Sequence, residues 1–115
     1  MNTGFGWVQI GDVTFDHDVV IHTDGTVTKR RKKRSRELKE QYGHTPLSEH
    51  ELDILKEEKP GVVYIGTGQY GSLPITPEAK ELLLDYHAII LPTPDLVATI
   101  GQEKGYYLAI IHVTC

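Results

Sequence analysis

The sequence has little of what builds disulfide-linked, metal-bound or membrane-spanning proteins. Its 115 residues include a single cysteine, Cys115, which excludes both an internal disulfide and a cysteine-rich metal site. No stretch approaches the roughly 18 apolar residues that a membrane-spanning helix needs. The opening residues, MNTGFGWVQI, lack the basic and apolar regions of a signal peptide. These absences favour a cytoplasmic protein without membrane contact.

Recognisable catalytic and metal-binding spacings are also missing. Six histidines are present, but none forms H-x₃-H, and His50-Glu51 lacks the second histidine of H-E-x-x-H. His112 and Cys115 lie three residues apart at the end of an apolar strand pattern, so their side chains point to opposite faces. His112 is more typical of a core or edge histidine than of a ligand. We therefore predict no catalytic residue, no metal and no cofactor.

What is present suffices for one domain, residues 1–115, with a hydrophobic content of 39%. The first thirty residues predict two β-hairpins, because short strand-like segments flank turn pairs that contain glycine. These segments are 7–10 with 13–15 around Gly11-Asp12, and 19–22 with 26–28 around Asp24-Gly25.

The second half alternates between helical and strand patterns, which predicts parallel strands joined by helices. Ser48 and Glu51 form the S-x-x-E pattern of a capping box, so a helix is expected over 49–58. Thr76-Pro77 and Thr93-Pro94 each read as a helix cap followed by the first helical residue, with Gly105 ending the second of these helices. Apolar strands are predicted at 62–65, 88–91 and 106–113.

The glycine-rich stretch GTGQYG after the first of these strands fits G-x-G-x-x-G. A dinucleotide site would need the helix to open at the loop and an acidic residue to end the next strand, and neither condition holds. Two interpretations remain, a strand-to-helix connection or a small anionic ligand site. The ligand site would include Thr93 and Asp95 if the two strands are neighbours. Its predicted residues are Gly66, Thr67, Gly68, Gln69, Gly71, Thr93 and Asp95.

A basic segment, KRRKKRSR at 29–36, holds seven of the twelve Lys and Arg residues, whereas the rest of the chain is strongly acidic. It predicts a flexible stretch that binds a partner protein, binds nucleic acid or is simply solvated. Nucleic acid is the weaker choice, because no aromatic residue interleaves the cations to stack on bases. The predicted partner-binding residues are Lys29, Arg30, Arg31, Lys32, Lys33, Arg34 and Arg36.

Several of these features together resemble the Mth938-type domain family. They are Gly66-Thr67-Gly68-Gln69, Asp24-Gly25 before basic residues, His44 before a Glu-Leu helix, the Thr93 helix with Ala98, and the ending IHVTC. The family includes archaeal and bacterial proteins of unknown function, a mitochondrial complex I assembly factor and an adipogenesis-associated protein. The sequence differs from the family pattern at Ile100-Gly101-Gln102, where we expect Tyr-Asn in a member of this family.

The resemblance implies an α/β (mixed α+β) fold in three layers around a central mixed sheet. It implies no catalytic residue and no cofactor. Our leading hypothesis is a non-enzymatic binding or assembly module whose partner is another protein. The first alternative is a small-molecule or anion site at Gly66–Gly71, which could also be the site of an enzyme. The second alternative is nucleic-acid binding through Lys29–Arg36.

Overall fold

The described part of the chain forms two β-sheets. The structure, a computed structural model, describes residues 1–101, 103 and 105–115. A small antiparallel sheet consists of β1 (Asn2–Gly4), β2 (Trp7–Ile10) and β3 (Val13–Phe15). The five-stranded sheet has the order β5-β4-β8-β6-β7. Its strands are β4 (Val19–Ile21), β5 (Val27–Lys29), β6 (Val62–Thr67), β7 (Ile89–Leu91) and β8 (Tyr107–His112).

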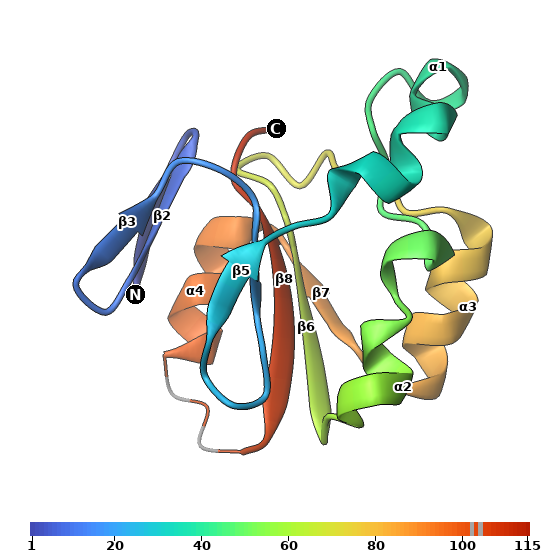
Figure 1. The fold of residues 1–115 in the computed structure, drawn as a ribbon. Helices are drawn as coiled ribbons and strands as arrows, with labels where there is room; N and C mark the ends of the chain where they lie inside the picture. The colour runs from blue at the N-terminus through green and yellow to red at the C-terminus, as the bar shows by residue number, and fades with distance from the viewer. Residues whose placement is uncertain (102, 104) are drawn as a thin grey trace.

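The five-stranded sheet is the middle of three layers, as Figure 1 shows. The helices α2 (Ile54–Glu58) and α3 (Pro77–Asp85) cover one face. The helix α4 (Thr93–Ile100) and the small sheet cover the other face. The short helices η1 (Lys32–Leu38), α1 (Lys39–Tyr42) and η2 (Glu49–Glu51) link β5 to α2. The mixed α/β class and the three-layer arrangement are thus confirmed, and no described helix is long and apolar enough to cross a membrane.

Residue alternation along the central strands explains why both faces must be covered. In β8, Leu108 and Ile110 belong to the core under α2 and α3, whereas Ala109 and Ile111 belong to the core under α4. Successive side chains of a strand point to opposite faces, so a strand with apolar residues at every position needs a layer on each side. The buried run from Leu108 to Val113 is therefore the centre of the molecule.

The predicted hairpins and most helix starts are confirmed. The two turns are at Gly11 and Gly25, which have φ of +60° and +89°, values that glycine adopts without steric cost. Thr76 caps α3, because its hydroxyl accepts a hydrogen bond from the Ala79 amide at 3.2 Å. The sequence patterns gave no sign of β1, which pairs with β2.

The predicted helix at 49–58 is wrong in one respect, because it is broken into η2 and α2 around Leu52-Asp53. Ser48 does cap the first turn, with its hydroxyl accepting from the His50 amide at 3.3 Å. Glu51 does not return to the cap as a capping box requires. Its carboxylate binds Arg30 instead, and this ion pair competes successfully for the side chain.

The start of α4 also differs from the prediction. Pro92 occupies the cap position, and Thr93 is the first residue of the helix. The hydroxyl of Thr93 is engaged elsewhere, since it accepts from the Gly68 amide and donates to the His112 carbonyl. The predicted helix end at Gly105 is wrong, because α4 ends at Ile100 with Gly101 as its cap. Gln102, where the sequence departs from the family pattern, lies outside the described residues.

The basic segment, predicted to be flexible, forms ordered structure. After Lys29 ends β5, the chain forms η1 over Lys32–Leu38, with the Ser35 side chain fully buried against η2. The helix α1 follows η1 directly, and Gly43 ends it in a left-handed conformation with φ +76°.

Candidate functional site

The carboxyl ends of the parallel strands β6, β7 and β8 meet at one edge of the central sheet. Open α/β sheets bind ligands at such an edge, so the residues gathered there form the candidate site. Gly66 and Thr67 end β6, and the rest of the glycine loop follows this strand. Thr93 comes after β7, and residues 113–115 come after β8. The basic segment reaches the same edge of the molecule from β5 (Figure 1).

The glycine loop and Thr93 do come together, as predicted for neighbouring strands. The Gly68 amide donates to the Thr93 hydroxyl at 2.9 Å, and the Thr93 amide donates to the Gly68 carbonyl at 2.9 Å. A Cβ on Gly66 would lie 2.9 Å from the same hydroxyl, so close packing requires glycine there. Thr67 donates to the Leu91 carbonyl at 3.1 Å. Asp95 lies apart from this cluster, exposed in the first turn of α4.

The loop amides bind the end of the described chain. The Gln69 amide donates to the Thr114 carbonyl at 2.7 Å, and the Tyr70 and Ser72 amides donate to the main-chain oxygen of Cys115 at 3.2 and 2.9 Å. Gly68, with φ +99°, approaches so closely that a Cβ would lie 2.3 Å from the Cys115 main chain. These contacts support the interpretation of the loop as a connection, and its role in ligand binding stays a prediction.

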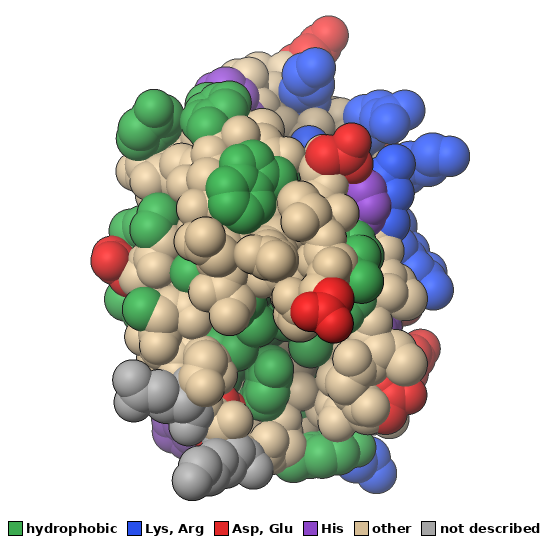
Figure 2. Space-filling model, turned by 90° about the vertical axis from the view of Figure 1, so that its left-hand side faces the viewer, with side chains coloured by type: hydrophobic (Ala, Val, Ile, Leu, Met, Phe, Trp, Pro, Cys, Tyr) green, Lys and Arg blue, Asp and Glu red, His purple; other side chains and the backbone are tan. Residues whose placement is uncertain are grey.

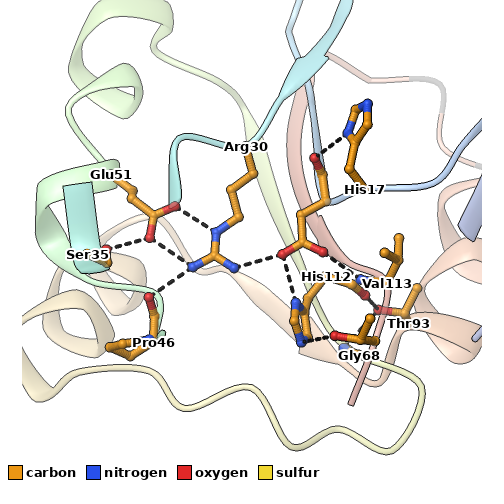
Figure 3. A network of polar contacts seen from close by, with 11 residues as sticks. His17, Arg30, Ser35, Pro46, Glu51, Gly68, Thr93, His112 and Val113 are labelled. Carbon is orange, nitrogen blue, oxygen red and sulfur yellow. Dashed lines mark hydrogen bonds and ion pairs between the residues drawn. The ribbon is translucent and has the colours of Figure 1, made fainter. Parts of the chain in front are cut away.

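A network of buried charges lies beside this loop (Figure 3). Arg30 is only 3% exposed and faces two carboxylates. Its Nε and Nη2 donate to the two oxygens of Glu51 at 2.7 and 2.9 Å, and its Nη1 donates to Asp18 Oδ2 at 2.9 Å. The Pro46 carbonyl accepts a fourth bond from Nη2 at 2.9 Å. The planar guanidinium suits this bidentate geometry, which an ammonium group could not reproduce.

The carboxylate of Asp18 joins three elements at the edge of the sheet. Besides Arg30, it accepts a hydrogen bond from His112 Nδ1 at 2.7 Å and one from the Val113 amide at 2.9 Å. Burial alone would raise the pKa of Asp18. The hydrogen bond from His112, the charge that this histidine carries when it is protonated, the Val113 amide and the charge of Arg30 outweigh burial and lower this pKa from 3.8 to about 2.

The pKa of Arg30 is shifted in the direction that keeps the network charged. Burial would lower it, but the hydrogen bonds and charges of Glu51 and Asp18 raise it above its ordinary value. Arg30 is therefore a fixed cation between two anions, and its positive charge is satisfied inside the protein. It differs in this respect from the remainder of the basic segment, in which only Ser35 is also buried.

His112 extends the network toward Thr114. Since Asp18 is ionised and only accepts hydrogen bonds, His112 Nδ1 must donate to it. In the neutral imidazole the other nitrogen, Nε2, is then an acceptor, and it lies 3.2 Å from the Thr114 hydroxyl. Residues two apart in an extended segment share a face, which is why these two side chains meet. The expectation that His112 is a satisfied core histidine is confirmed by its two side-chain contacts.

A cavity of about 730 Å³ opens over this network. Its walls include Asp18, Val113 and Thr114, and most of the rest comes from the basic segment. The cations that line it are Lys29, Arg30, Arg31, Lys32, Lys33, Arg34 and Arg36, and the other lining residues are Asp16 and His17. Figure 2 shows Lys and Arg side chains gathered along one upper edge of the molecule. A volume of this size falls in the range of ordinary ligand sites.

The predicted partner-binding residues therefore divide into two groups. Arg30 is buried in the network, and Arg34 forms a surface ion pair with Asp53 at 2.6 Å. Within the described part of the chain, the other five form no ion pair within 4 Å. These five, which we call the free cations, are Lys29, Arg31, Lys32, Lys33 and Arg36.

Sequence patterns missed Asp18, Glu51 and Thr114 as members of the site. Asp18 was visible only as one acid of Asp16-His17-Asp18, and Glu51 was assigned to a helix cap. The basic segment gave no local signal of the buried Arg30, because Arg is almost never fully buried unless it is paired, and its partners lie far away in the sequence. Among the described residues, no group of three or more His, Cys, Asp and Glu could hold a metal ion.

Comparison with known proteins places this geometry in a structural family. No protein-family model matches the sequence, and no curated protein matches it. Among solved structures, the conserved hypothetical protein PH1505 from Pyrococcus horikoshii OT3 is 36% identical, with a TM-score of 0.85 over 100% of this chain and 98% of its own. The protein named MT938 is 34% identical, with a TM-score of 0.81 over 100% of this chain and 96% of its own.

A third structure, of a protein from Bordetella parapertussis, has a TM-score of 0.56 at 18% identity, over 97% of this chain and 92% of its own. At this identity it shows the fold alone. The first two matches combine full-length coverage with more than 30% identity, and their agreement extends from β1 to residues 113–115. The chain therefore belongs to the Mth938-type family.

Proposed function

We propose that this domain is a binding module that recognises an acidic segment of another protein at the basic cavity. The observation that carries the proposal is the set of five free cations lining one cavity of about 730 Å³. Seven Lys or Arg side chains face two Asp side chains there, so the lining has a formal charge of +5. A concave surface of one charge attracts and orients an anionic partner.

The ordered backbone of the basic segment supports recognition by a preformed surface. The buried side chains of Arg30 and Ser35 attach it to η2 and to Asp18, so the free cations project from a fixed scaffold. A preorganised site loses less conformational entropy on binding than a flexible tail does. The proposal of a binding module therefore rests on the geometry of the basic segment, because the similar structures are those of proteins without a stated function.

An acidic protein segment suits the cavity better than nucleic acid does. Among the described residues, the lining contains no Phe, Tyr or Trp on which bases could stack. Outside the basic segment the chain carries five Lys or Arg against sixteen acids, so an extended nucleic acid would meet repulsion beyond the cavity. We also propose that this binding module is soluble and acts in the cytoplasm.

The test uses a fluorescent ten-residue glutamate peptide and measures its anisotropy with the full chain at about 50 mM and about 200 mM salt. We expect saturable binding that weakens with salt, and a loss of at least about tenfold in affinity when Arg31, Lys32, Lys33 and Arg36 are all replaced by Gln. The control replaces Lys56 and Lys80 by Gln, which removes two exposed cations on α2 and α3 away from the cavity.

Three outcomes would contradict the proposal. The first is the absence of saturable peptide binding by the native chain, and the second is equal binding by the quadruple and control variants. The third is tighter binding of a ten-nucleotide single-stranded DNA of matched charge, which would favour the nucleic-acid alternative. A folded quadruple variant is expected, because all four side chains are exposed and lie outside the buried network.

A further inference from the structure

The contacts among Asp18, His112 and Thr114 form a carboxylate–histidine–hydroxyl relay. Asp18 Oδ2 accepts from His112 Nδ1 at 2.7 Å, and His112 Nε2 lies 3.2 Å from Thr114 Oγ1. A carboxylate that fixes the histidine tautomer leaves Nε2 as an acceptor for the hydroxyl proton, as in enzymes that activate a serine or threonine. The side chains of Asp18 and His112 are 5% and 10% exposed, so water competes little for the hydrogen bond between them.

The relay opens onto solvent at its hydroxyl end. Thr114 is half-buried and lines the basic cavity. His112, Thr114 and Cys115 also line a second, smaller cavity of about 170 Å³. The other polar residues that line it are Lys32, Lys39, His44, Thr45 and Ser72. A reactant could therefore approach the Thr114 hydroxyl from a space that already contains two cations.

An amide donor adjoins the hydroxyl. Among the described residues, no group accepts a hydrogen bond from the Cys115 amide, although the Cys115 main-chain oxygen accepts two. In enzymes that transfer acyl groups, the amide of the residue after the nucleophile often stabilises the developing oxyanion. The chain thus brings together an orienting acid, a base, a hydroxyl and an unused amide at one end of β8.

We propose that Thr114 is a nucleophile, with His112 as its general base and Asp18 as a positioning residue, and that it accepts an acyl group from an activated, anionic ester. Thr114 Oγ attacks the ester carbonyl carbon while its proton moves to His112 Nε2. The ester bond breaks, the alcohol leaves with that proton, and an acyl-Thr114 ester remains. Water then attacks this ester, again losing a proton to His112, which releases the carboxylic acid and restores the Thr114 hydroxyl.

The chain contains a similar arrangement that serves as an internal comparison. His22 Nδ1 lies 2.5 Å from Glu58 Oε2, and His22 Nε2 lies 2.6 Å from Thr28 Oγ1. Its acid and histidine side chains are each 20% exposed, and Thr28 is exposed on β5. Solvent weakens electrostatic stabilisation at such a site. We therefore expect Thr28 to be unreactive under conditions in which Thr114 reacts.

The experiment treats the full chain with the mono-4-nitrophenyl ester of succinic acid and follows both nitrophenolate release and the mass of the protein. We expect a burst of nitrophenolate and one succinyl group on Thr114, mapped by peptide mass spectrometry. Hydroxylamine should remove this group, because it cleaves esters and leaves the amides of acylated lysines intact. Thr114→Val, which keeps the shape of the side chain, should abolish the labile adduct, and Thr114→Ser should retain it.

Two further variants separate catalysis from structure. His112→Gln should slow acylation at least about tenfold, in a chain shown to be folded by its unfolding midpoint. Thr28→Val should leave the rate unchanged. The absence of a hydroxylamine-labile group on Thr114, or labelling of Thr28 or Cys115 in its place, would overturn the proposal.

The anionic nature of the ester rests on the proposed function, whereas the nucleophile does not. 4-Nitrophenyl acetate, which is neutral, distinguishes the two. If Thr114 accepts acetyl and succinyl groups at equal rates, the relay stands and the role of the free cations fails. If neither ester acylates Thr114 while the glutamate peptide still binds, the relay fails and the binding function stands.

Discussion

The side chains of Arg30 and Glu51 face each other in the protein interior, joined by two parallel hydrogen bonds of 2.7 and 2.9 Å. They lie 21 residues apart in the sequence and attach the basic segment to η2. The pair attaches a cationic surface to the fold by means of one of the surface's own cations. It also removes that cation from the set available to a partner.

Removing Arg30 should destabilise the protein strongly. Arg30→Met leaves the carboxylates of Asp18 and Glu51 buried without their cation, and we expect a loss of about 3–5 kcal/mol in the free energy of unfolding. Chemical denaturation measures this loss. The matched control is Arg34→Met, which breaks the exposed ion pair with Asp53 and should cost no more than about 1 kcal/mol. Similar losses for the two variants would show that the network contributes no more than a surface pair.

Asp18 should make the protein sensitive to acid. Its pKa is lowered from 3.8 to about 2 in the folded state, mainly because the His112 and Val113 hydrogen bonds and the charge of Arg30 outweigh its burial. A group with a depressed pKa stabilises the fold above its unfolded pKa, and this stabilisation is lost as the pH falls through the folded pKa. The difference corresponds to about 2 kcal/mol.

We therefore expect the free energy of unfolding to fall between about pH 4 and about pH 2. The Asp18→Asn variant should show a smaller decrease over the same interval, because an amide has no proton to gain. Urea titrations at several pH values measure both slopes. Parallel profiles for the native chain and the variant would show that other carboxyl groups determine the acid response.

Ser48→Ala should remove more than a helix cap. Ser35 donates to Glu51 Oε2 at 2.6 Å, so the proton between Ser48 and Ser35 must come from Ser48. The oxygen of Ser48 then accepts from the His50 amide. Losing both contacts at a fully buried site should cost about 1–2 kcal/mol. Ser72→Ala, at an exposed position, is the control and should change stability by less than about 0.5 kcal/mol. A null effect of Ser48→Ala would place the helix start elsewhere.

Two glycines with similar backbone angles should respond differently to alanine. Gly68 and Gly25 have φ of +99° and +89°, so both substitutions carry the strain of a left-handed residue, about 1–2 kcal/mol. At Gly68 the new Cβ would also lie 2.3 Å from the Cys115 main chain, whereas nothing lies within 4 Å at Gly25. Overpacking should add about 1–3 kcal/mol at Gly68 alone. Equal thermal midpoints for the two variants would contradict the close approach.

Lys59 offers a stabilising change. It ends α2 in a left-handed conformation with φ +47°, which costs a side-chain-bearing residue more than it costs glycine. Lys59→Gly should raise the free energy of unfolding by about 0.5–1 kcal/mol, after the larger conformational entropy of unfolded glycine is subtracted. The denaturation midpoint tests this gain. A decrease would mean that the Lys59 side chain contributes contacts that outweigh its backbone strain.

Local patterns predicted the parts of the fold that depend on neighbouring residues. The turns at Gly11 and Gly25, the cap at Thr76 and the strand predicted at 106–113, which is observed as β8 over Tyr107–His112, each follow from a few consecutive residues. The inward position of Arg30 could not be predicted in this way, because its partners lie 12, 16 and 21 residues away. The same long-range contact explains the broken helix, since Glu51 had two candidate partners and local spacing revealed only one.

The candidate site shows the same division. The meeting of Gly68 with Thr93 was expected from strands that run parallel and lie side by side. The use of the loop amides by residues 114 and 115 was not, because it depends on where β8 enters the sheet. Thr114 lies near His112 because the backbone remains extended after β8. A strand pattern predicts the strand itself but not the conformation of the residues that follow it.

The place of β8 in the sheet has a consequence for biosynthesis. This strand lies between β4 and β6 and is hydrogen-bonded to both. Until residues 107–112 have been synthesised, the pair β5-β4 and the pair β6-β7 are therefore not joined to each other. A nascent chain emerging from a ribosome therefore exposes two half-sheets with open edges, and such edges promote aggregation. Chaperone dependence should be concentrated in this interval of synthesis, and it should end when β8 pairs with both half-sheets.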